Sequence, residues 1–174
     1  MTRFVFAPLL VLAVGSPSFA QDMPLSQILI DGEGWKKVDV PNAKPKRSPG
    51  RVMTFSPDGG TMFEQAVLNE PFLRATPVVE GGDVNFRATR YAPLRTRRGE
   101  SAITVTGLAT DRDGRIYAAT DIGVQVFDPT GRLCGVLTPA AEGKPEYLAF
   151  EADKLTLWIG DTKYTRNLNT TGAK

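Results

Sequence analysis

The side chains best suited to chemistry in this chain are acidic, and several of them stand in turns. The run Asp111-Arg112-Asp113-Gly114 begins like a calcium-binding loop, in which oxygen ligands recur at alternate positions. The continuation does not fit, because such a loop needs a third acid where Arg115 stands and a glutamate where Ile122 stands. A hairpin turn, for which aspartate and glycine supply the tight bend, is therefore the favoured interpretation.

Two other residue types limit the possible chemistry further. The chain has no histidine and a single cysteine, Cys134. The lack of histidine excludes Ser-His-Asp and Cys-His nucleophiles, His-ligated zinc and imidazole acid-base catalysis. Cys134 has no partner for an intramolecular disulfide, and it stands in an apolar run, so we interpret it as a small buried residue rather than a reactive thiol.

The segment 106–137, TGLATDRDGRIYAATDIGVQVFDPTGRLCGVL, has the pattern of a β-propeller blade. Turn signals at Asp113-Gly114, Ile122-Gly123 and 128–131 separate short alternating runs. These runs predict four strands within about one blade length, over 107–110, 115–119, 123–127 and 133–137.

An internal repeat extends this pattern along the chain. The turn aspartates Asp58, Asp113 and Asp153 stand 55 and 40 residues apart, which brackets the spacing of about 40–50 residues typical of propeller blades. We therefore expect an all-β fold, a partial β-propeller of about three four-stranded blades near 51–94, 106–137 and 146–168. The apolar residues expected in its core are Val52, Phe55, Leu108, Ile116, Val126, Leu148, Phe150 and Leu157.

The ends of the chain predict its domain organisation and location. Residues 1–20 have a basic start at Arg3, an apolar run over 4–14 and a Ser18-Phe19-Ala20 cleavage pattern, which indicates a signal peptide. Export to the periplasm or the extracellular space follows from that prediction. The remaining chain divides into a leader and connector over 21–48, the partial propeller over 49–168 and a flexible tail over 169–174.

The charge balance does not suggest that the protein binds nucleic acid or a membrane. The chain carries 21 basic and 19 acidic side chains, for a formal net charge of +2. Nothing in this balance points to nucleic acid or to a membrane. We interpret the cluster of Arg95, Arg97 and Arg98, which has no interleaved aromatic residues, as a solvated loop rather than a phosphate-binding site.

Three stretches of sequence, DRDGRIYAAT, GVQVFDPTGRL and LSQILIDGEGWKKV, resemble the gluconolactonase and regucalcin (senescence marker protein, LRE-like region) family. The resemblance implies a six-bladed propeller that hydrolyses lactones with a divalent metal, calcium or zinc, in its central channel. It covers the C-terminal half of the family fold. The early blades, which carry the motif of a metal-binding glutamate, have no counterpart here.

The resemblance also implies where metal ligands would stand. The family places an asparagine four residues before the end of one inner strand and an aspartate at the equivalent place in a later blade. Arg51, four residues before Phe55, and Thr106, four residues before Thr110, occupy those positions here. The last repeat has Glu146 at the equivalent place. A guanidinium cannot coordinate a cation, and a hydroxyl is a poor substitute for a carboxylate. We therefore predict no catalytic residue, no metal ligand and no cofactor.

Two functions remain open at this point. One is a gluconolactonase-like protein that has lost catalytic competence and serves as a binding module or a decayed relative. The other is an active metal-dependent lactonase or carboxylic ester hydrolase, with a small lactone as its ligand. Since three blades form an open arc with apolar ends, we also expect either the leader to fold over one end or two copies to complete a ring.

Overall fold

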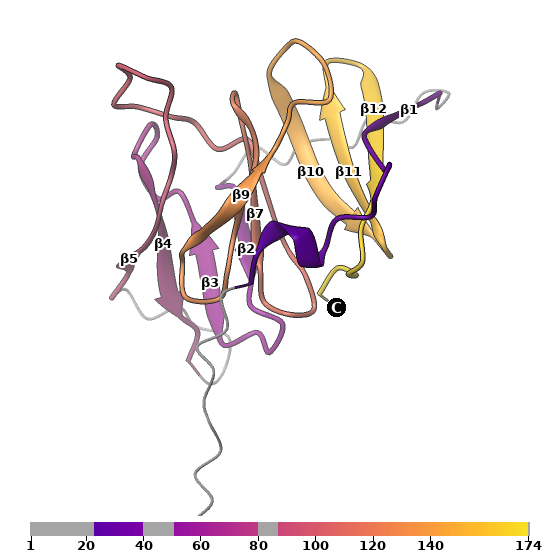
Figure 1. The fold of residues 1–174 in the computed structure, drawn as a ribbon. Coiled ribbons are helices and arrows are strands. Elements are labelled where there is room, and N and C mark those ends of the chain that lie inside the picture. The colour runs from indigo at the N-terminus through magenta and orange to yellow at the C-terminus, as the bar shows by residue number, and fades with distance from the viewer. Residues whose placement is uncertain (1–22, 40–50, 80–86, 174) are drawn as a thin grey trace, which may run out of the picture.

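The protein folds as three four-stranded antiparallel sheets that fan out around one side, as Figure 1 shows. This computed structural model describes residues 23–39, 51–79 and 87–173. Within them the helical part is one 3-10 turn, η1 (Leu25–Gln27). No helix in the described part of the chain is long and apolar enough to cross a membrane. The all-β prediction is confirmed, whereas the predicted signal peptide lies outside the described residues.

Each sheet corresponds to one propeller blade. Blade 1 consists of β2 (Met53–Phe55), β3 (Thr61–Glu64), β4 (Phe72–Pro77) and β5 (Thr89–Pro93). Blade 2 consists of β6 (Gly107–Thr110), β7 (Ile116–Thr120), β8 (Gly123–Phe127) and β9 (Leu133–Leu137). Blade 3 consists of β10 (Pro145–Glu151), β11 (Lys154–Ile159), β12 (Thr162–Asn167) and β1 (Lys36–Val38).

Blade 2 is the centre of the molecule because both of its faces are covered. Alternate residues of a strand point to opposite faces, so Ile116 and Ala118 pack against blade 1, and Tyr117 and Ala119 against blade 3. On the blade 3 side they meet Leu155. All residues of β6, β7 and β8 are buried as a result.

Most of the expected core residues are buried. Five of the eight lie in the two clusters between blades: Leu108, Ile116, Val126, Leu148 and Leu157. Val52 and Phe150 are half-buried and pack against the clusters. Phe55 was predicted wrongly, since it is 43% exposed. It lies on the face of blade 1 directed away from blade 2. The alternation of apolar and polar residues does not show whether a further sheet packs on that face.

The N-terminal leader completes blade 3 instead of lying as a separate cap. Strand β1 pairs antiparallel with β12, with Lys36 opposite Thr165, and so forms the outer strand of a sheet whose other strands end the chain. Before it, Ile28 is buried in the cluster between blades 2 and 3. The Trp35 indole donates a hydrogen bond from Nε1 to the Thr138 carbonyl at 2.8 Å.

The C-terminal segment differs from the flexible tail that the sequence suggested. The backbone amide of Asn169 donates to the Ile28 carbonyl at 2.9 Å, and that of Ala173 donates to the Thr110 carbonyl at 2.9 Å. Between them, Gly172 forms an isolated bridge with Asp111. Residues 169–173 are therefore held between the leader and the turn after β6, as Figure 1 shows near the label C.

Candidate functional site

The starts of the three inner strands define the place where the resemblance would put a metal. Strands β2, β6 and β10 are neighbours, because β6 contacts both of the others. In each antiparallel blade the start of the inner strand lies at the same end as the turn between the second and third strands. Arg51, Thr106 and Glu146 all stand at this end of their blades.

The three side chains differ in burial and in the groups that they contact. The Arg51 side chain is 64% exposed, and its Nη1 lies 3.5 Å from Oε1 of the buried Glu64. Thr106 is buried, and its Oγ1 donates a hydrogen bond to the Ala119 carbonyl at 3.3 Å. Glu146 is half-buried, at a register shift between β10 and β11.

This set of groups does not fit calcium or zinc. Both ions need several oxygen, sulfur or imidazole donors that converge, and calcium takes six to eight oxygens. Here the set is a cation, a hydroxyl that already donates to a carbonyl, and one carboxylate. In residues 23–39, 51–79 and 87–173, no three His, Cys, Asp or Glu side chains are arranged to hold a metal.

A hollow with a volume of about 440 Å³ lies along the inner strands of all three blades. Thr54 of β2 and Thr110 of β6 share a hydrogen bond of 2.9 Å between their hydroxyls at its wall. Phe55, Leu108 and Tyr147 are among the side chains that line it, and no charged residue of the described chain does. The hollow can hold a neutral or apolar group, but its lining offers no general base.

Comparison with solved structures agrees with the blade arrangement. A gluconolactonase from Xanthomonas campestris matches over 67% of this chain and 37% of its own, with a TM-score of 0.53 and 21% identity. Regucalcin from Agrobacterium tumefaciens, a calcium-binding protein, matches over 70% of this chain and 46% of its own, with a TM-score of 0.52 and 18% identity. The chain has the fold of these propellers.

The match is partial and lies at the level of fold. A third structure, named as a candidate gluconolactonase, matches over 71% of this chain and 40% of its own, with a TM-score of 0.54 and 17% identity. The chain thus spans less than half the length of each of these propellers. No family sequence model matches the chain, and neither does any curated protein.

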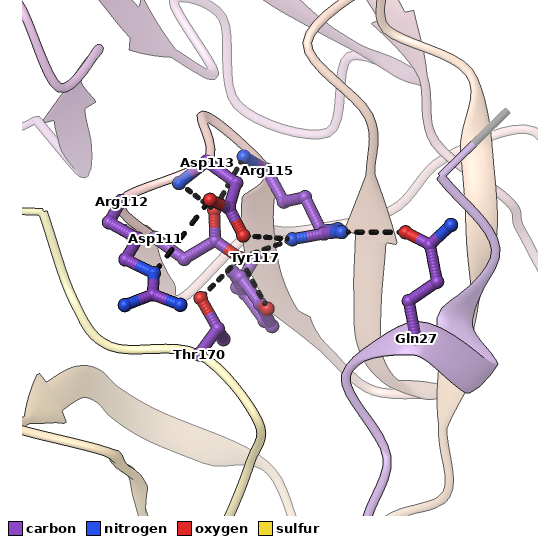
Figure 2. A network of polar contacts seen from close by, with 7 residues as sticks. All are labelled: Gln27, Asp111, Arg112, Asp113, Arg115, Tyr117 and Thr170. Carbon is purple, nitrogen blue, oxygen red and sulfur yellow. Dashed lines mark hydrogen bonds and ion pairs between the residues drawn. The ribbon is translucent and has the colours of Figure 1, made fainter. Parts of the chain in front are cut away.

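A buried polar network lies at the end of blade 2 opposite to the start of its inner strand β6 (Figure 2). Its extent could not be seen in the sequence. Asp111, directly after β6, has no exposed surface. Its Oδ1 accepts hydrogen bonds from the backbone amides of Asp113 at 3.0 Å and Arg115 at 2.8 Å. This is the predicted hairpin turn, but the turn residue that organises it is Asp111 rather than the repeated Asp113.

The second oxygen of Asp111 binds three side chains. Its Oδ2 accepts from Arg115 Nη1 at 3.1 Å, from the Tyr117 hydroxyl at 3.0 Å and from the Thr170 hydroxyl at 3.2 Å. The same guanidinium donates from Nη2 to the Gln27 side-chain oxygen at 3.1 Å. The Asp111–Arg115 pair therefore joins blade 2 to the leader through Arg115 and to the C-terminal segment through Asp111, as Figure 2 shows.

The electrostatics of this network fit a structural role. Burial, and then the negative charge of Asp111, raise the pKa of the Tyr117 hydroxyl well above its ordinary value, so it remains a hydrogen-bond donor. The carboxylate of Asp111 already accepts five hydrogen bonds. It has no lone pair left for a substrate or a metal ion. The calcium-loop interpretation of this acidic turn is excluded by that saturation.

Cys134 lies in β9, half-buried against the cluster between blades 2 and 3. Burial, and then the negative charge of Asp128, raise the pKa of its thiol to about 11. We expect slow alkylation by iodoacetamide at pH 7.5, with a rate that increases as the pH approaches 11, because the thiolate is the nucleophile. The same measurement in denaturant is the control. Fast alkylation of the folded protein at pH 7.5 would contradict the prediction.

Proposed function

We propose that this chain is an exported, gluconolactonase-like propeller protein that does not hydrolyse lactones and acts as a binding module. One observation supports the proposal: a guanidinium, an occupied hydroxyl and a single carboxylate stand at the starts of its three inner strands. In a metal-dependent lactonase the metal polarises the carbonyl and activates water. Arg51 and Thr106 would contribute neither ligands nor a general base to such a reaction.

The competing candidate is an active metal-dependent lactonase or ester hydrolase, and it rests on the fold alone. Metal analysis and lactone hydrolysis with the purified chain from Gln21 separate the two. We expect no stoichiometric calcium or zinc and no saturable turnover. Stoichiometric metal together with turnover that saturates with lactone would refute the proposed function.

A variant with the family ligands is the matched control for that assay. We expect Arg51→Asn with Thr106→Asp to lower the melting temperature in the absence of calcium, because the new carboxylate would face the Ala119 carbonyl that Thr106 now contacts. Calcium should restore part of that loss in the double variant, since a ligand stabilises the state that binds it. Wild-type protein should show no such shift. Equal responses of both proteins to calcium would show that these positions are not the ligand positions.

Export is part of this proposal and has its own test. The predicted cleavage site follows Ala20, so mature protein recovered from the periplasm or the medium should begin at Gln21. Mass spectrometry of the intact protein measures this directly. An uncleaved chain confined to the cytoplasm would disprove export.

Self-association is proposed at the side of blade 1 where Met53 and Phe55 are exposed. Five large apolar side chains of the described chain are strongly exposed, and all lie in or beside blade 1: Met53, Phe55, Val67, Leu68 and Val79. In a closed propeller the next blade would pack here, and a second copy offers similar sheets.

Light scattering over a dilution series tests this contact. We expect a dimer that dissociates on dilution, and we expect Phe55→Ser with Met53→Ser to shift the equilibrium to monomer. Lys37→Ser, on the exposed outer strand β1, is the control. A monomer at all concentrations, without binding of a hydrophobic dye, would rule the dimer out.

A further inference from the structure

Four connections meet around a second hollow, at the same end of the blades as the inner-strand starts. They are the segments between β3 and β4, β5 and β6, β7 and β8, and β9 and β10. The hollow has a volume of about 470 Å³. It lies apart from the hollow along the inner strands, because the two share no lining residue.

Two basic side chains and one acidic side chain line this hollow. Arg97 is held by one residue: its Nε lies 3.3 Å from Asp121 Oδ2, and its Nη2 donates to the Asp121 carbonyl at 3.2 Å. Lys144 makes no hydrogen bond or ion pair with any described residue. The lining therefore carries a net positive charge, and guanidinium and ammonium donors remain available.

The remaining lining supplies a rigid polar wall. Thr104 Oγ1 donates to Asn69 Oδ1 at 2.6 Å, which leaves the amide NH₂ of Asn69 as a further donor. Asn69 has a φ of 65°, a left-handed turn conformation that asparagine adopts more readily than most residues other than glycine. The connection that carries Thr104 is fixed by Gln65, whose side chain bonds the backbone of Ile103 at 2.7 Å and Val105 at 2.9 Å.

We propose that this hollow binds a small oxyanion, an organic carboxylate or a phosphate compound, between Arg97 and Lys144. Asn69 adds a neutral donor, and the buried Ile103 supplies an apolar contact. A planar guanidinium oriented by a carboxylate is suited to bidentate contact with such groups. The sequence interpretation of a solvated arginine loop stays a prediction for Arg95 and Arg98 but is replaced for Arg97. The site does not depend on whether the chain hydrolyses lactones.

Titration of the mature chain with inorganic phosphate and, separately, with citrate tests the site at constant ionic strength. We expect saturable chemical-shift changes at the backbone amides of Asn69 and Lys144. Lys144→Met and Arg97→Gln should each weaken binding about tenfold, the effect of one charge-assisted contact. Arg98→Gln is the matched control, since Arg98 is exposed and does not line the hollow. Saturable binding of either probe supports the site, and the stronger probe shows which of the two oxyanions it holds better.

Two results would overturn the proposal. One is the absence of saturable binding of either probe. The other is an equal loss of anion affinity in Arg98→Gln and Lys144→Met, which would mean that the affinity depends on the net charge of the protein and not on this hollow. Lys144→Met keeps the test decisive if Arg97→Gln perturbs the loop, because Lys144 has no partner within the described structure that the substitution could disrupt.

Discussion

Replacing Asp111 by alanine is expected to lower the free energy of unfolding by about 3–5 kcal/mol, the usual cost of removing one partner of a buried ion pair. Arg115 is 3% exposed, and without Asp111 its buried charge would keep one carboxylate partner, the partly exposed Asp113, whose Oδ2 lies 2.9 Å from Nη1. The hydroxyls of Tyr117 and Thr170 would lose their acceptor as well. Chemical denaturation monitored by circular dichroism measures the change.

The matched control is Asp153→Asn, at the corresponding turn of blade 3. Asp153 is exposed, so its substitution should change stability by less than about 0.5 kcal/mol. If Asp111→Ala behaved like this control, the network would not contribute to stability. Hydrogen exchange adds a separate readout, because the amide of Ala173 should lose protection once Thr170 is released.

Gly107→Val is expected to destabilise the protein by about 3 kcal/mol, because the backbones of blades 2 and 3 are closely packed at this glycine. A Cβ atom at position 107 would lie 2.7 Å from both the Cβ and the backbone nitrogen of Leu148. Since one of these atoms belongs to the backbone of β10, the inner strands β6 and β10 would have to move apart. Thermal unfolding measures the loss.

Gly34→Ala serves as the control for that substitution. No atom lies within 4 Å of a Cβ built at Gly34, so its effect should remain within about 0.5 kcal/mol. Wild-type stability in Gly107→Val would contradict the close packing of β6 on β10. Full instability would agree with it, provided that Gly34→Ala folds normally.

The strands of blade 2 could be predicted almost to the residue, since its turns contain strong local signals. The expected strand over 115–119 lies at Ile116–Thr120, and the other three have the predicted bounds. Alternation also identified Leu108 and Ile116 as core residues. Alternation was wrong for Phe55, because it shows which residues share a face of the strand but not whether another blade covers that face.

The parts that the sequence did not predict all depend on distant segments. Strand β1 is three residues long and largely exposed, and its place in a sheet is set by β12 at the other end of the chain. Asp111 resembles any turn aspartate until Thr170 and Gln27 enclose its network. Likewise, Arg97 becomes part of a hollow only through Asp121 and Lys144, which belong to other connections.

The pairing of β1 with β12 has a consequence for how the protein folds. Strand β1 cannot join its sheet until β12 has been synthesised, because Lys36 lies opposite Thr165. Contacts so distant along the chain must overcome the entropy of closing a very long loop, which slows folding. Blades 1 and 2 can form from neighbouring hairpins as the chain emerges. Blade 3 closes afterwards, so its native sheet forms only once both β1 and β12 are available.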